Sequence, residues 1–281
     1  MKQRISLLCA ILSLSMLNLA CAEADTDNLP PQPLYWELFG GGGAFSTGSI
    51  SQTGSIFYPV LQGGALDIDA TGNGSSSGVW MIGINMGYKW PEISTKNSGW
   101  LFGPAAEIEA YYLQGTQNAT LDNQNPPNES DNRLVTPAEV NQFSATYPMH
   151  TGVFLLNAIL SAHQKDSKIH PYIGAGIGAA VISIQGATAN LTDPAVTDVN
   201  FYNSNQDATD WAFATQAKLG IDYTISENTS IFAEYRFLYL TSTSYAFGGA
   251  NSDSYSSSSD WEVNMGGMTF NMGTIGIRYD A

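Results

Sequence analysis

The chain has 281 residues, a formal net charge of −15 and a charged fraction of only 12%. So acidic a balance argues against nucleic-acid binding, which needs lysine and arginine on the phosphates. An average soluble domain has a charged fraction of about 25%. Here Gly, Tyr, Ser, Thr and Asn supply the polarity instead, which suits strands that face lipid on one side.

The first 22 residues have the order of a secretory signal peptide. Lys2 and Arg4 precede an apolar run, and Ala20-Cys21-Ala22 follows as a cleavage site. We expect residues 1–22 to be removed and residues 23–34 to form a periplasmic segment. Cleavage also removes Cys9 and Cys21, the only cysteines, so no disulfide or cysteine metal site is expected. Lipidation of Cys21 and retention of the segment as an anchor are the alternatives.

After residue 22 no stretch has about 18 uninterrupted apolar residues, so the sequence predicts no membrane-spanning helix. For a membrane protein this leaves a closed β-barrel, because every backbone polar group needs a partner in lipid.

Eight segments alternate apolar with polar or small residues, which is the pattern of transmembrane strands. In the second segment Trp80, Ile82 and Ile84 share one face, and Met81 and Gly83 share the other. The predicted strands are 35–46, 78–90, 99–114, 151–163, 169–185, 211–225, 230–243 and 270–279.

The connections between these segments are short and long in strict alternation. Short turns are predicted at 91–98, 164–168 and 226–229, and long loops at 47–77, 116–150, 186–210 and 244–267. Bacterial barrels have short periplasmic turns and long external loops. The sequence therefore predicts an all-β protein, with an eight-stranded antiparallel up-and-down transmembrane β-barrel over residues 35–281. A soluble β-sandwich is the alternative, and it requires apolar inner faces.

Charged residues within the strands fall on the face opposite the lipid. Charge on the lipid face costs roughly 2–4 kcal/mol for Arg or Lys at mid-membrane. We therefore expect five acids and four bases to form a network of ion pairs that fills the lumen, with Lys218 and Glu234 as one pair. A narrow ion pathway is the alternative. The predicted lumenal residues are Glu37, Lys89, Glu107, Glu109, Lys218, Asp222, Glu234, Arg236 and Arg278.

Large aromatic residues gather near the predicted strand ends, as in the two girdles at the membrane interfaces. Those near periplasmic ends are Trp36, Trp90, Trp100, Tyr172 and Tyr223. Those near outer ends are Trp80, Trp211 and Tyr239.

Two patterns could carry chemistry but favour simpler interpretations. Residues 174–179 fit the dinucleotide motif G-x-G-x-x-G/A, yet a β-type run follows where that motif needs a helix. Small residues here make room inside a narrow barrel. The spacing of His150, His163 and His170 indicates no metal site, and solvated histidines are expected at the turn 164–168. We predict no enzyme activity and no catalytic, cofactor-binding or metal-binding residue.

The region 169–237 resembles a family of small outer-membrane proteins. His170-Pro171-Tyr172-Ile173-Gly174-Ala175-Gly176-Ile177-Gly178 is similar to a strand of small outer-membrane surface antigens. The runs 213–223 and 226–237 resemble the strand that follows and the family's last hairpin, and 276–279 resembles its closing strand. The relatives are the rickettsial major surface antigens and the OmpA/OmpX-like porin family. The resemblance implies an eight-stranded barrel in the bacterial outer membrane.

The expected function is that of a surface protein with a structural, surface-antigen or adhesin-like role through its external loops. The loops contain most of the remaining acids, and tracts such as 75–77 and 256–259 predict flexibility. Expected partners are membrane lipid, lipopolysaccharide reached through cations, and a host or phage surface. A small non-specific pore and an envelope enzyme acting on lipid A are the alternatives. The sequence does not determine the oligomeric state.

Overall fold

The computed structural model describes residues 33–57, 65–95, 99–123, 142–193, 195, 199–250 and 257–281. The predicted signal peptide, both cysteines and the cleavage site lie outside these residues. The described residues form β-strands joined by turns, and they contain no helix that is long and apolar enough to cross a membrane.

Eight antiparallel strands close into a ring, in which each strand pairs with two neighbours. Around the ring they are β1 (Leu34–Thr47), β4 (Ser77–Lys89), β6 (Trp100–Asn123), β7 (Gln142–Gln164), β8 (Ile169–Ile184), β10 (Ala208–Ser226), β11 (Thr229–Leu240) and β14 (Met268–Asp280). β14 pairs with β1 from Tyr35–Asp280 to Thr47–Met268. The predicted eight-stranded up-and-down barrel is confirmed.

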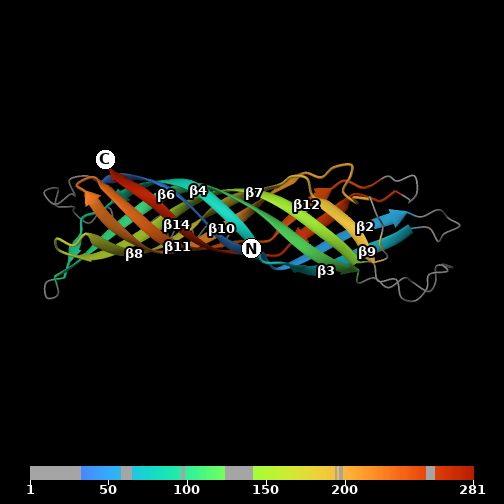
Figure 1. Ribbon diagram of the computed structural model, residues 1–281, viewed down its shortest axis with the longest axis horizontal. Helices are drawn as coiled ribbons and strands as arrows, with labels where there is room; N and C mark the ends of the chain where they lie inside the picture. The colour runs from blue at the N-terminus through green and yellow to red at the C-terminus, as the bar shows by residue number, and fades with distance from the viewer. Residues whose placement is uncertain are drawn as a thin grey trace, which may run out of the picture.

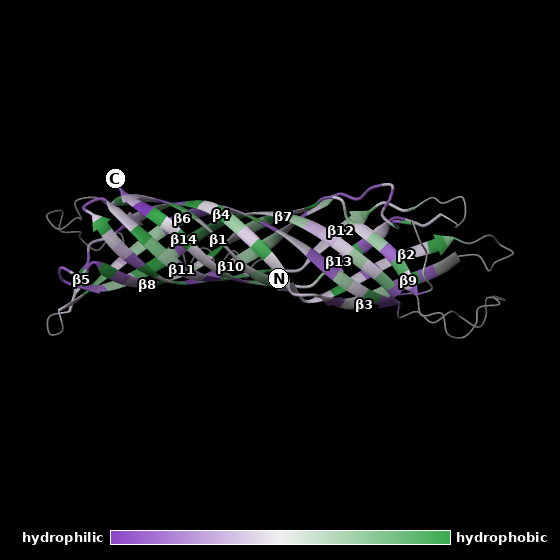
Figure 2. Ribbon diagram, in the orientation of Figure 1, coloured by the Kyte–Doolittle hydropathy of each residue, from purple (hydrophilic) through white to green (hydrophobic). Residues whose placement is uncertain are grey.

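The alternation of side chains sets which face of each strand is buried. In β11, Phe232, Glu234 and Arg236 are buried, whereas Ile231 and Tyr235 are exposed on the outer face. Figure 2 shows the same alternation as repeated apolar and polar segments along the barrel strands. Because the period is two, one register fixes the inner and outer face of a whole strand.

The long connections are more ordered than the sequence analysis predicted. The first contains β2 (Ser49–Phe57) and β3 (Ala65–Gly74), the third contains β9 (Thr188–Asp193), and the fourth contains β12 (Thr243–Phe247) and β13 (Trp261–Met265). β2 pairs with β3 and β13, so the hairpins join one another as well as the barrel. These strands lie at the end of the barrel away from the C-terminus (Figure 1). A two-residue strand, β5 (Ile93–Ser94), pairs with β6 at the opposite end.

β6 and β7 also extend well beyond the strands predicted at 99–114 and 151–163. They pair from Trp100–Gln164 to Asp122–Gln142. β6 has 24 residues and β7 has 23, whereas a tilted transmembrane strand needs only about 9–11 residues, so more than half of each strand exceeds the length of the span. The prediction of loops at 116–150 was therefore wrong for the described residues at both ends. We call the projecting part, formed by β2, β3, β9, β12, β13, the outer ends of β6 and β7 and the described connecting residues 199–207, 248–250 and 257–260, the external extension.

Candidate functional site

The middle of the lumen holds a layer of buried charges contributed by strands on opposite sides of the ring. Lys218 on β10 contacts three carboxylates, with its Nζ 2.6 Å from Glu107, 3.4 Å from Glu109 and 3.7 Å from Glu234. Arg236 on β11 forms ion pairs with Glu109 and Glu234. β6 and β11 lie diametrically across the ring, so the pair between Arg236 and Glu109 spans the lumen.

Neutral side chains complete this charged layer. Asn157 and Gln216 donate hydrogen bonds of 2.5 and 2.9 Å to Glu109. Tyr111 donates to Gln216, and the guanidinium of Arg236 lies 3.9 Å from the ring centre of Phe39. A buried charge is tolerated when it is paired and hydrogen-bonded, and these contacts supply such partners to Glu109 from β7, β10 and β11. Parity in the sequence could have identified Asn157 and Gln216 as lumenal, but the analysis followed charged residues alone.

A second charged group lies nearer the periplasmic end. Arg278 on β14 contacts Glu37 on β1 at 2.6 Å and Asp222 on β10 at 2.5 Å. Asn85 donates a 2.5 Å hydrogen bond to Glu37. Lys89 lies at the mouth of the lumen and pairs with Asp280 at 2.5 Å, a partner that the sequence analysis did not include. All nine predicted lumenal side chains thus point inward, seven of them buried and Lys89 and Arg278 partly buried.

The lumen becomes apolar on the outer side of the charged layer. Phe45 and Phe270 stack with ring centres 5.1 Å apart. Buried apolar residues from the seven barrel strands other than β1 continue this filling: Met81, Leu113, Val153, Leu155, Ala180, Ala212, Ala214, Leu238, Leu240 and Met272. Side chains therefore fill the lumen along its described length, as expected for a barrel of eight strands.

The external extension has an aromatic core of its own. Trp261 on β13 is fully buried between Phe143 on β7 and Phe201, with ring centres 5.9 and 6.0 Å away. Tyr202 donates a 2.6 Å hydrogen bond to Gln52 and lies 3.0 Å from the hydroxyl of Tyr147. Burial raises the pKa of the Tyr202 hydroxyl well above its usual value, so this hydroxyl stays neutral. The extension is therefore a packed unit, not a set of flexible loops.

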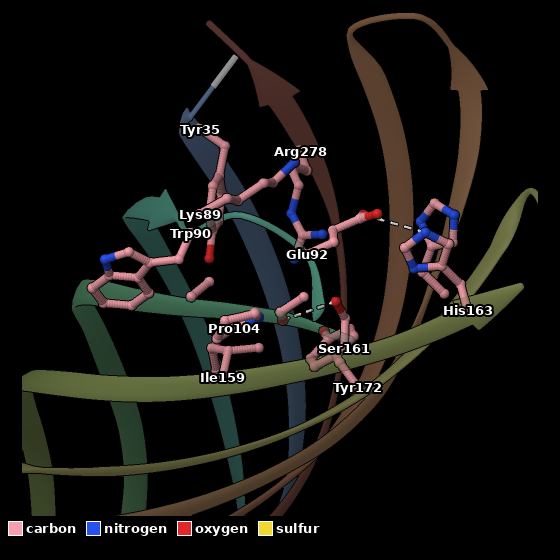
Figure 3. Close-up of a pocket in the computed structure, with 13 residues that line it drawn as sticks. Tyr35, Lys89, Trp90, Glu92, Pro104, Ile159, Ser161, His163, Tyr172 and Arg278 are labelled. Atoms are coloured by element: carbon pink, nitrogen blue, oxygen red, sulfur yellow. Dashed lines mark hydrogen bonds and ion pairs between the residues drawn. The ribbon is translucent and has the colours of Figure 1, made fainter. Parts of the chain in front are cut away.

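The periplasmic mouth contains a small pocket of about 150 Å³. Figure 3 shows Lys89, Trp90, Glu92 and His163 around it, with Tyr172 and Arg278 toward the lumen. The sequence analysis expected His163 and His170 to be solvated separately at their turn. The structure instead places their ring centres 4.4 Å apart. Among the described residues, no three His, Cys, Asp or Glu side chains are grouped so as to surround a metal ion.

Six of the eight predicted interface aromatics are exposed on the outer face of the barrel: Trp36, Trp80, Trp100, Trp211, Tyr223 and Tyr239. Trp90 follows β4, lines the periplasmic pocket and packs against Tyr88. The prediction of Tyr172 as an interface aromatic is wrong, because Tyr172 is buried in the lumen and donates a 3.0 Å hydrogen bond to Glu234. It shares the inward face of β8 with Gly174 and Gly176, so parity decides its direction and nearness to a strand end does not.

The surface antigen profile matches residues 103–279, which is more than half of the chain. The chain belongs to the surface antigen family. The resemblance to small outer-membrane surface antigens that the sequence predicted is therefore confirmed, and this protein is a β-barrel surface protein of the outer membrane. No curated protein sequence matches it.

Several solved outer-membrane proteins are similar to this chain. The outer membrane protease OmpT from Escherichia coli is 9% identical, with a TM-score of 0.40, and the match covers 92% of this chain and 100% of that one. Neisserial surface protein A is 12% identical, with a TM-score of 0.29 and coverage of 88% and 97%. Ail, the attachment invasion locus protein of Yersinia pestis, is 12% identical, with a TM-score of 0.25 and coverage of 85% and 99%.

Proposed function

We propose that this protein is a non-enzymatic surface protein that binds a positively charged partner through its external extension. The observation that supports this most is the distribution of charge. The described residues of the extension contain no Lys or Arg, and six acids are exposed there: Asp67, Asp122, Asp193, Asp207, Asp260 and Glu262. A surface of one sign attracts partners of the other sign and raises the association rate.

The packing of the extension also supports a recognition role. Strands β2, β3 and β13 pair in a continuous sheet, and the core around Trp261 fixes that sheet above the membrane. A preorganised surface loses less conformational entropy on binding than a flexible loop does. The extension therefore offers fixed side chains to a partner outside the cell.

The filled lumen favours surface recognition over a pore. The charged layer pairs its bases with its acids across the barrel, and apolar side chains dominate the layer outside it. Cation-bridged contact with lipopolysaccharide and contact with a basic host or phage protein share one chemistry, which is positive charge presented to exposed carboxylates. We favour the basic protein, because a rigid and protruding extension suits contact beyond the lipid headgroups.

The proposal is tested with purified, folded protein in lipid nanodiscs, flowed over an immobilised basic polypeptide. Neutralising Asp260 and Glu262 (Asp260→Asn, Glu262→Gln) should slow association at low salt and weaken its dependence on ionic strength. The matched control neutralises Asp166 and Glu227, which are exposed at the periplasmic turns (Asp166→Asn, Glu227→Gln).

The two double variants remove equal charge, so a difference in their association rates shows that the location of the removed charge matters. Equal losses in the two variants, or unchanged binding in the external one, would overturn the proposed surface. Binding that appears only to lipopolysaccharide with added divalent cations would assign the extension to the lipid layer instead of a protein partner.

A further inference from the structure

Two histidines face each other across the hairpin at the periplasmic mouth. His163 lies near the end of β7 and His170 near the start of β8. The register of β7 and β8 pairs Ser161 with Tyr172. Two residues closer to the turn on each strand, the same register puts His163 opposite His170. Side chains directly opposite each other in an antiparallel pair have Cβ atoms about 4.5–5.5 Å apart. The observed 4.4 Å between the two ring centres agrees with that placement.

The polar contacts of the two rings leave the same nitrogen free on each. The Nε2 of His163 lies 3.3 Å from a carboxylate oxygen of Glu92, and the Nε2 of His170 lies 2.9 Å from the carbonyl oxygen of Ser167. When Nε2 donates its hydrogen to an oxygen, Nδ1 of a neutral imidazole keeps its lone pair. The Nδ1 of His163 is buried and has no hydrogen-bond partner, and none is found for the Nδ1 of His170 among the described residues.

This is the arrangement that metal-binding histidines adopt. A ligating imidazole typically donates its other N–H to a carboxylate or a backbone carbonyl, which fixes the tautomer and orients the ring. Here the Glu92 carboxylate lies beside the Nε2 of His163, and the Ser167 carbonyl is hydrogen-bonded to the Nε2 of His170. Neutral imidazole is a suitable ligand for zinc, copper and nickel. The distance between zinc and a ligating imidazole nitrogen is about 2.0–2.1 Å.

We propose that His163 and His170 bind one divalent transition-metal ion, with Zn²⁺ as the probe, at the periplasmic mouth of the barrel. The two histidines are the protein ligands, and water from the adjoining pocket of about 150 Å³ fills the remaining positions. Glu92 belongs to the turn between β4 and β6, so its contact with His163 connects that turn to the histidine pair on the hairpin of β7 and β8 (Figure 3). The site lies at the opposite end of the barrel from the proposed recognition surface and does not depend on it.

The test uses full-length folded protein in detergent, purified without a polyhistidine tag and stripped with a chelator. Titration with Zn²⁺ in a calorimeter should show one ion per chain, and His170→Gln should weaken binding at least tenfold. Glu92→Gln should cause a smaller loss, because it removes an orienting contact and not a ligand.

The third histidine provides the matched control. His150 lies toward the outer end of β7, where its Nδ1 is 2.5 Å from the hydroxyl of Tyr112, so His150→Gln should leave the affinity for Zn²⁺ unchanged. Unboiled electrophoretic mobility verifies that each variant is folded. Absence of one-to-one binding in the wild-type protein, an equal loss in His150→Gln, or unchanged binding in the His163→Gln/His170→Gln double variant would overturn the proposal.

Discussion

Replacement of Lys218 by methionine tests the buried charge layer most directly. The Lys218 side chain is 1% exposed, and its Nζ lies within 4 Å of Glu107, Glu109 and Glu234. Methionine has a similar length, so the change removes the charge and leaves little empty volume. Removing one partner of a buried ion pair costs about 3–5 kcal/mol, because the remaining charge is left without compensation. Folded domains are stable by only about 5–15 kcal/mol, so we expect Lys218→Met to remove a large part of the stability.

The measurement is urea-induced unfolding in lipid vesicles, followed by tryptophan fluorescence and by the mobility of unboiled samples in SDS. Lys168→Met is the matched control, because Lys168 is exposed at a periplasmic turn. We expect that control to change the free energy of unfolding by less than about 0.5 kcal/mol. The double variant Lys218→Met/Glu107→Gln should be more stable than Lys218→Met alone, since it also removes the carboxylate closest to the lost charge.

Two results would refute this reasoning. A cost below about 1 kcal/mol for Lys218→Met would place the ammonium group in water, not in a low-dielectric lumen. Additive costs in the double variant would show that Lys218 and Glu107 are not coupled, and would count against the contact across the ring.

Three further predictions follow from the same structure. A peptide tag inserted at Ser257 should be accessible on intact cells and a tag at Asp166 should not, and the reverse labelling would invert the barrel. Purified monomer should give no stable single-channel conductance in a planar bilayer, because side chains fill the lumen; reproducible steps would favour a pore. Gly220→Ala should destabilise the barrel by about 1–3 kcal/mol, because a Cβ there would lie 2.4 Å from the ring of Tyr172, and Tyr172→Ala in the same chain should relieve most of that cost. Equal destabilisation with and without the tyrosine ring would contradict that contact.

The strands of the external extension could not be predicted from the pattern of hydrophobic residues. Residues 116–121 and 143–149 alternate with period two, and their buried members include Gln117, Leu121, Phe143 and Tyr147. The period was present in the sequence, but polar residues obscured it, and the segments were predicted as loops. Contacts between distant segments stabilise these strands, as Phe143 with Trp261 shows, and such contacts leave no mark on the local sequence.

Tyr172 and the histidine pair show the same limit at the scale of single residues. Tyr172 was assigned to the membrane interface from its place near a strand end, whereas the parity of β8 turns it into the lumen. His163 and His170 are seven positions apart, which fits no usual metal-ligand spacing. Only the register of the β7–β8 hairpin brings their rings together.

The sequence by itself determined the number of barrel strands, the alternation of short turns and long connections, and the inward direction of all nine predicted lumenal charges. It could do so because side-chain direction in a strand is a local property with a period of two. Only the tertiary structure decided which charges meet. Arg236 reaches Glu109 and Lys218 reaches Glu107 across the ring, and Tyr202 reaches Gln52 in the extension. Those pairings depend on strand tilt, stagger and closure, which act on the whole barrel and are not encoded in any one strand.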